Sequence, residues 1–130
     1  MENKIILLDT SVLIDYFRKK NKSKTLLYKL TGKNKLFAIS AISEFEIYTG
    51  SNELQTEYWN SFFAEIVVYP FDSETSQIAA KLDKNLKNKR KQIDIPDLFI
   101  AATAIKNNVT IATLNQKHFE RIDGLDVIAG

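Results

Sequence analysis

The chain has no cysteine and only one histidine among its 130 residues. Without cysteine it forms neither disulfides nor thiolate metal sites, and one imidazole is too few for a histidine-rich zinc site. The longest uninterrupted apolar run, residues 98–102, is far shorter than the roughly 20 residues of a membrane span. The residues after Met1 also lack the pattern of a secretory signal. These absences predict a cytoplasmic protein that does not enter a membrane and whose metal ligands, if it has any, are oxygen atoms.

Strong net charge is missing as well. The formal charge is +2, so the composition alone does not require a nucleic-acid partner. The 45% hydrophobic and 26% charged residues suit one globular domain spanning residues 1–130. Positive charge is concentrated in "RKKNKSK" (18–24) and "KLDKNLKNKRK" (81–91). Such runs can neutralise phosphates, although charge alone favours a solvated helix face and a loop.

Short apolar segments alternate with helical patterns along the chain. Strands are predicted at residues 5–8, 36–39, 66–69 and 110–112 and near Val127. Helices are predicted at residues 12–17, 25–30, 41–48, 54–63, 73–87 and 96–105, with a helical turn at 117–120. This alternation favours an α/β fold with a parallel sheet covered on both faces. Ligands in such folds bind beyond the carboxyl ends of the strands.

The first strand, in "IILLDTSVLIDYF" (5–17), ends on Asp9 and is followed by two hydroxyl residues. Thr10 or Ser11 could cap the helix that comes next. Asp9 itself could be a cap, a turn former or one wall of an active site. Its position at the end of a strand favours the active site.

Three further polar residues are expected near the same edge. Glu46, in "SAISEFEIYTG" (40–50), shares a helical face with Ser43, or it is simply an exposed helix acid. Asp97 lies in the first turn of the apolar helix in "IDIPDLFIAATAI" (93–105), where Asp94 and Asp97 could instead form a capping arrangement. Asn115 follows the strand in "TIATLNQKHF" (110–119) and could shape a turn.

Three carboxylates in one cleft repel one another, and desolvation strengthens the repulsion. Either a carboxylate takes up a proton or a divalent cation neutralises the cluster. Oxygen ligands without cysteine or histidine suit Mg²⁺ or Mn²⁺. Such an ion can support hydrolysis of a phosphodiester, with the basic runs holding the phosphate backbone.

These segments, in this order, resemble the PIN domain family and, within it, the VapC-type ribonuclease toxins of toxin–antitoxin pairs. The resemblance covers nearly the whole chain. It places the three acidic roles, with metal binding, on Asp9, Glu46 and Asp97. Asn115 takes the fourth catalytic place, where the family carries Asp or Asn, and its neutral amide leaves three formal negative charges.

The resemblance implies a three-layer α/β/α sandwich with a central parallel sheet and Mg²⁺- or Mn²⁺-dependent endoribonuclease activity. The substrate would be RNA of the tRNA or rRNA class. The implied partners are a second copy in a homodimer and a cognate antitoxin. A catalytically silent PIN-like module that binds RNA or protein is the alternative.

Two other folds with acidic pockets fit less well. A receiver-type signalling domain needs a pair of acids after the first strand and an Asp after the third, where Leu8 and Pro70 stand. A haloacid-dehalogenase-like phosphatase needs an acid two residues after Asp9, where Ser11 stands. Other acids are interpreted as structural, in caps and turns: Asp15, Asp72, Asp94, Asp123 and Asp126.

Three large aromatic residues, Trp59, Phe62 and Phe63, lie within five positions of one predicted helix. The simpler interpretation is that they belong to the core. The alternative is an apolar groove for a second copy or an antitoxin helix.

Overall fold

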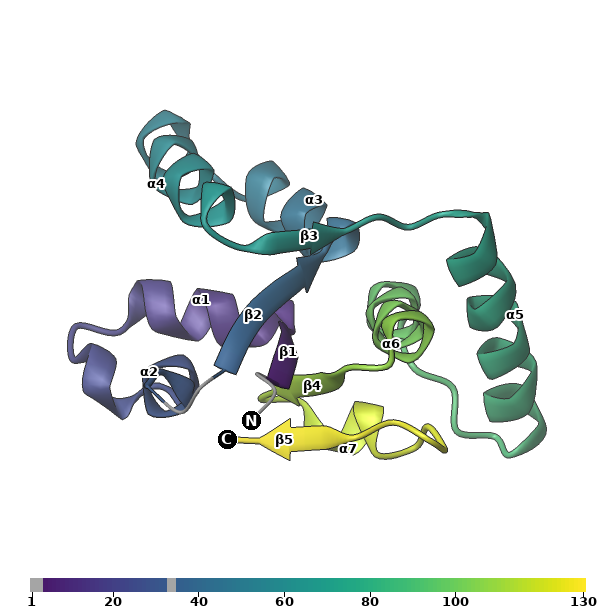
Figure 1. The fold of residues 1–130 in the computed structure, drawn as a ribbon. Helices are drawn as coiled ribbons and strands as arrows, with labels where there is room; N and C mark the ends of the chain where they lie inside the picture. Colours follow the sequence, from purple (N-terminus) through teal and green to yellow (C-terminus); the bar gives the residue numbers. More distant parts are fainter. Residues whose placement is uncertain (1–3, 33–34) are drawn as a thin grey trace.

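The centre of the molecule is a sheet of five parallel strands, seen in a computed structural model that describes residues 4–32 and 35–130 (Figure 1). Neighbouring strands all pair in parallel, in the order β3-β2-β1-β4-β5. The strands are β1 Lys4–Leu8, β2 Lys35–Ser40, β3 Val67–Tyr69, β4 Thr110–Thr113 and β5 Val127–Ala129. The predicted parallel sheet is confirmed, and the carboxyl ends of its strands meet at one edge.

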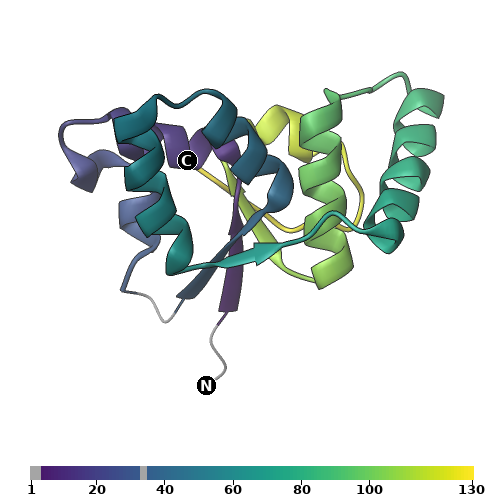
Figure 2. The same cartoon turned by 90° about the horizontal axis from the view of Figure 1, so that it is seen from above.

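Helices cover both faces of this sheet, which gives the three-layer α/β/α sandwich (Figures 1 and 2). The helices are α1 Thr10–Arg18, α2 Leu26–Leu30, α3 Ala41–Thr49, α4 Glu53–Ala64, α5 Ser73–Asn88, α6 Ile95–Asn107 and α7 Gln116–Phe119. A short 3-10 turn, η1 Lys22–Lys24, was not predicted from the sequence. Within the described residues, no helix is long and apolar enough to cross a membrane.

The central strand β1 contributes side chains to both hydrophobic cores, one on each face of the sheet. Ile6 and Leu8 pack with α1, α2 and α4 on one face of the sheet, and Leu7 packs with α5 and α6 on the other. All three side chains are fully buried. Burying an aliphatic side chain of this size contributes about 1.5–3 kcal/mol. The continuous apolar run of β1 therefore reflects a strand that is covered on both sides.

The aromatic residues of α4 belong mainly to the first core. Trp59 and Phe63 are buried, with ring centroids 5.4 Å apart. Phe62 is partly buried and packs against the same core. The core interpretation is therefore confirmed for Trp59 and Phe63, and only Phe62 keeps partial exposure.

Two of the acids predicted to be structural, Asp72 and Asp15, accept hydrogen bonds or pair with lysines. Asp72 accepts a hydrogen bond from the backbone N–H of Thr75 and so caps α5. Its other oxygen pairs with Lys106 of α6 at 2.5 Å. Because it accepts these hydrogen bonds, that of Lys106 most strongly, the pKa of Asp72 is held well below its usual range. Asp15 pairs with Lys19 within α1.

Candidate active site at the carboxyl edge of the sheet

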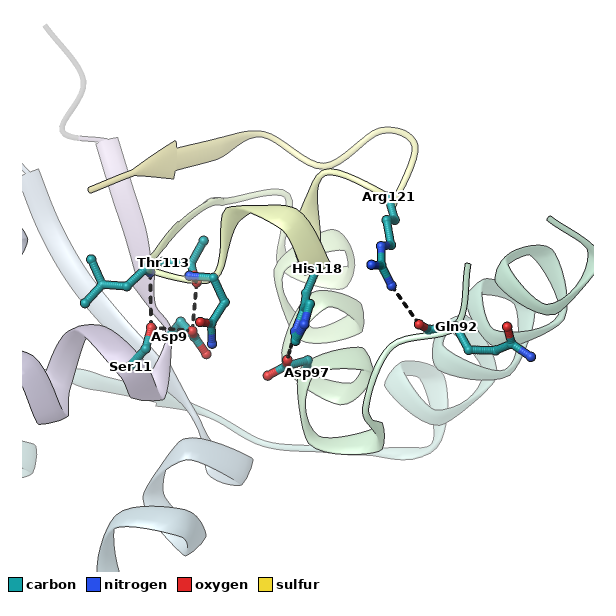
Figure 3. A network of polar contacts seen from close by, with 9 residues as sticks. Asp9, Ser11, Gln92, Asp97, Thr113, His118 and Arg121 are labelled. Atoms are coloured by element: carbon teal, nitrogen blue, oxygen red, sulfur yellow. Dashed lines mark hydrogen bonds and ion pairs between the residues drawn. The ribbon is translucent and has the colours of Figure 1, made fainter. Parts of the chain in front are cut away.

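The topology brings the four predicted site residues to one edge of the sheet. Asp9 directly follows β1, and Glu46 lies on α3, which follows β2. Asp97 lies in the first turn of α6, and Asn115 follows β4, the strand that pairs with β1. Figure 3 shows Asp9 and Asp97 at this edge.

Asp9 is almost completely buried, with 1% of its surface exposed. It occupies the N-cap position of α1, but its side chain makes no capping hydrogen bond. Its Oδ2 instead accepts hydrogen bonds from Ser11 Oγ at 2.7 Å and Thr113 Oγ1 at 2.8 Å (Figure 3). The expectation that Thr10 or Ser11 caps the helix is wrong, because Thr10 is already the first helical residue and Asp9 precedes it.

Asp9 is a buried carboxyl group whose hydrogen-bond partners are neutral hydroxyl groups. Burial raises its pKa, the hydrogen bonds from Ser11 and Thr113 lower it, and the negative charge of Asp97 raises it, with a net increase above the usual value. In the part of the chain that the structure describes, no lysine, arginine or histidine forms an ion pair with Asp9. A cation in this place would relieve both the desolvation and the repulsion from Asp97.

Asp97 is in direct contact with His118. The Oδ2 of Asp97 lies 2.8 Å from Nδ1 of His118, which is on α7 (Figure 3). The preceding acid, Asp94, is the N-cap residue of α6 and makes no side-chain capping hydrogen bond. The capping arrangement considered from the sequence is therefore not formed, and Asp97 is directed into the site.

Glu46 is held by a residue of α1. Thr10 Oγ1 lies 2.8 Å from Glu46 Oε1 and 2.8 Å from Ser43 Oγ. A carboxylate can only accept, so the single hydroxyl proton of Thr10 serves Glu46 and the Ser43 hydroxyl donates to Thr10. The prediction that Glu46 and Ser43 share a helical face is confirmed by this common neighbour. Glu46 is thus directed toward the residue next to Asp9.

The segment after β4 is hydrogen-bonded to the two hydroxyl groups that contact Asp9. The backbone N–H of Asn115 donates to Thr113 Oγ1 at 2.9 Å, and that of Leu114 donates to Ser11 Oγ at 3.1 Å. Asn115 stands at the N-cap position of α7 without a side-chain capping bond, and the residue is exposed. The side-chain amide of Asn115 therefore does not cap α7.

Three contributors to this site were not assigned from the sequence: Ser11 and Thr113 as partners of Asp9, and His118 as the partner of Asp97. Thr113 is the last residue of β4 and Ser11 lies shortly after β1, and this position near strand ends is the only local signal for them. From the sequence, His118 bears only on the exclusion of a histidine-rich zinc site. Nothing in its immediate sequence indicates that it faces an acid 21 positions earlier.

The predicted ligand atoms are carboxylate and amide oxygens, which suit a hard divalent cation. Asp9 and Asp97 fit this role best, since their charges interact and Asp9 forms no ion pair with a cation among the described residues. Across residues 4–32 and 35–130, however, no three Asp, Glu, His or Cys side chains are grouped closely enough to hold an ion. Thr10 holds Glu46 and His118 holds Asp97, so the assignment of three carboxylate ligands stays a prediction.

Comparisons with known proteins agree with this architecture. The profile of the PIN domain matches residues 6–125. Ribonuclease VapC1 of Methanocaldococcus jannaschii is 41% identical over 123 residues, covering 93% of this chain and 83% of that protein. Ribonuclease VapC19 of Mycobacterium tuberculosis is 28% identical over 113 residues, covering 87% and 90%.

Among solved structures, the crystal structure of VapBC2 from Rickettsia felis bound to a DNA fragment from their promoter has the same fold. The TM-score is 0.85 at 27% identity, with 97% of this chain and 98% of that chain covered. VapBC-1 from nontypeable Haemophilus influenzae matches with a TM-score of 0.83 at 24% identity over 96% of this chain and 97% of that chain, a likeness of fold.

Proposed function

This chain belongs to the PIN domain family, and from that premise we propose that it is a divalent-metal-dependent endoribonuclease, the toxin of a toxin–antitoxin pair. The active unit is proposed to be the single domain of residues 1–130. The observation that carries the proposal is Asp9, a buried carboxylate at the carboxyl edge of the sheet that caps nothing and repels Asp97.

In this proposal Asp9 and Asp97 hold Mg²⁺ or Mn²⁺, and Glu46 is a further ligand or orients a water. The cation supplies charge neutralisation and Lewis acidity toward phosphate oxygens. Ser11 and Thr113 fix the Asp9 carboxylate through their hydroxyl groups, and Thr10 directs Glu46.

Asn115 is proposed to position the scissile phosphate through its exposed amide. The amide can donate to a phosphate oxygen, which a carboxylate cannot do. This gives the neutral residue a catalytic role that does not require it to bind the metal ion.

The proposed partners follow from the relatives. Because VapC relatives are named ribonucleases and matching structures are VapBC complexes, we assign RNA as substrate and a cognate antitoxin as inhibitor. The RNA is proposed to be of the tRNA or rRNA class, the chain to form a homodimer and the site of action to be the cytoplasm.

The test uses purified protein, a mixed RNA pool containing tRNA and rRNA, and Mg²⁺ or Mn²⁺ compared with a chelator. Wild-type protein should cleave RNA only with the metal ion, and Asp9→Asn should not cleave at all. Asp94→Asn is the matched control, because it removes one carboxylate of the same type at the start of α6.

Failure of the wild-type protein to cleave tRNA and rRNA under these conditions would overturn the ribonuclease proposal. In that case, retained RNA binding would favour the catalytically silent binding module. Unchanged cleavage by folded Asp9→Asn would instead show that Asp9 is not a catalytic residue.

A further inference from the structure

A cavity of about 720 Å³ next to the candidate site is lined almost entirely by charged side chains. Its lining consists of Arg90, Lys91, Gln92, Lys117, Glu120 and Arg121. Four of these residues are cationic and one is acidic. The cavity therefore carries a clear excess of positive charge.

The two walls of this cavity are joined by a hydrogen bond. Arg121 Nη1, just after α7, donates to the backbone carbonyl of Gln92 at 2.9 Å (Figure 3). On the other wall, Arg90 adopts a left-handed backbone with φ 56°, and the N–H of Lys91 donates to the carbonyl of Leu86 at 2.9 Å. The loop after α5 is thus folded back on its own helix and tied to the end of α7.

The charge of the cavity contrasts with that of its surroundings. In the basic run at 81–91, Lys87 pairs with Asp83 at 2.8 Å and Lys89 pairs with Asp123 at 2.8 Å. Among the described residues, Arg90, Lys91 and Lys117 form no ion pair. Lys81 and Lys84 of the same run also form no ion pair among the described residues, but they do not line the cavity. Arg90, Lys91 and Lys117 are therefore the unpaired cations that the cavity offers to an external anion.

Helix α7 connects the cavity to the catalytic edge. Lys117 lines the cavity, and the next residue, His118, contacts Asp97. Consecutive Cα atoms are about 3.8 Å apart, so the basic lining begins one residue from the partner of a catalytic acid. In the view of Figure 3, the pair of Asp97 and His118 lies between Asp9 and Arg121.

We propose that this basic cavity binds the phosphate backbone of the RNA strand, at a nucleotide neighbouring the phosphate that is cleaved. The inference rests on the proposed ribonuclease function and adds a substrate-binding site to it. Phosphate contacts of this kind fix the register of a strand without reading its bases. The cavity therefore contributes affinity and positioning, and sequence preference arises elsewhere.

The test measures binding without turnover. Asp9→Asn protein is titrated into a fluorescent single-stranded RNA in the presence of chelator, at several salt concentrations. The cavity variant adds Lys91→Gln and Lys117→Gln, which spares Arg121 and its bond to Gln92. The matched control adds Lys81→Gln and Lys84→Gln, which remove the same charge from exposed positions of α5 outside this cavity.

The cavity variant should bind RNA more weakly, and the loss should be similar for RNAs of different sequence. Each phosphate contact in single-stranded nucleic acid contributes about 0.7 to the slope of log affinity against log salt, so two lost contacts reduce it by about 1.4. The control variant should keep the slope of the Asp9→Asn parent protein. Equal losses in the two variants, or no loss in either, would overturn the proposal.

Two further outcomes keep the inference separate from the proposed function. RNA binding that depends on the cavity, together with no RNA cleavage by the wild-type protein in Mg²⁺ or Mn²⁺, would refute the ribonuclease and leave the phosphate site standing. If the cavity bound a poly-glutamate peptide and the protein did not bind RNA, the proposal of an RNA phosphate site would be wrong. The cavity would then be assigned to an acidic protein partner.

Discussion

Thr113 Oγ1, at the end of β4, donates a hydrogen bond of 2.8 Å to Asp9 Oδ2, at the end of β1. The two residues are 104 positions apart in the chain, and both are buried. This bond satisfies a carboxylate that has no cationic partner among the described residues, and it ties together the two strands that carry the candidate site.

Replacing Thr113 by Val keeps the shape of the side chain and removes both the donor to Asp9 and the acceptor of the Asn115 backbone N–H. Since a hydrogen bond to a charged group contributes about 1.5–3 kcal/mol, Thr113→Val should lower the free energy of unfolding by an amount in that range. Urea denaturation at neutral pH measures the change. Thr103→Val is the matched control, because buried Thr103 donates only to the neutral carbonyl of Phe99, and it should cost less. An equal or smaller loss for Thr113→Val would contradict a charge-assisted bond.

Asp9→Asn should become more stable relative to wild type as the pH rises. Burial raises the pKa of Asp9 in the folded state, so the folded protein holds this proton at pH values where the unfolded chain has released it. Stability from this group is therefore lost as pH rises from the unfolded value of about 3.9 to the higher folded value. Asn can still accept from Ser11 and Thr113, so the two proteins converge in acid.

The measurement for Asp9→Asn is a set of urea unfolding curves for both proteins with chelator between about pH 4 and pH 7.5, the range in which carboxylates with a raised pKa titrate. Adding Mg²⁺ or Mn²⁺ should then stabilise wild type and not the variant, since a ligand that binds only the folded state shifts unfolding. A stability difference that does not change with pH would show that Asp9 does not carry the raised pKa.

The sequence was sufficient to predict the sheet, its parallel direction and the edge at which Asp9 lies. The apolar run from Ile5 to Leu8 and the helical periodicities between strands are local signals, and strand ends follow from them. The elements in the structure start and end within a few residues of the predicted bounds. Asp9 and Asp97 could be placed together because the topology of a parallel sheet fixes which ends meet.

The internal contacts of the site could not be predicted in the same way. The bond from Thr113 to Asp9 and the contact of His118 with Asp97 depend on side-chain directions that no local pattern encodes. The capping roles considered for Asp9 and Asp94 were equally consistent with the sequence. Only the direction of each side chain rejects them.

Asp94 and Asp97 should differ sharply in their importance for cleavage, although they lie one turn apart. Asp94 is exposed at the start of α6, and substitutions at such positions usually change stability by less than about 0.5 kcal/mol. Asp94→Asn should therefore keep wild-type cleavage, whereas Asp97→Asn should abolish it. RNA cleavage with Mg²⁺ or Mn²⁺ measures both, and circular dichroism checks the fold. Loss of cleavage in folded Asp94→Asn would show that its interpretation as structural is wrong.

Thr10→Val should reduce cleavage without weakening RNA binding. The variant removes the hydroxyl that holds Glu46 and leaves the helix start intact. Removing a residue that orients a metal ligand typically costs 10–100-fold in activity, so kcat should fall by about 10-fold or more while KM for RNA stays near its original value. Thr10→Ser restores the hydroxyl and should restore kcat. Wild-type kcat in Thr10→Val would mean that Glu46 does not act from its position against Thr10.

Trp59 of α4 and Phe45 of α3 offer a direct test of which aromatic residues form the core. Trp59 is 3% exposed and stacks on Phe63, whereas Phe45 is 67% exposed. Trp59→Ala should lower the free energy of unfolding by about 3–5 kcal/mol, because it removes a buried aromatic ring and leaves a cavity. Phe45→Ala should change it by less than about 0.5 kcal/mol, as expected for a surface position. Urea denaturation of dilute protein measures both changes. A small loss for Trp59→Ala would contradict its place in the core. It would favour the alternative that the aromatic residues of α4 form a groove for a partner.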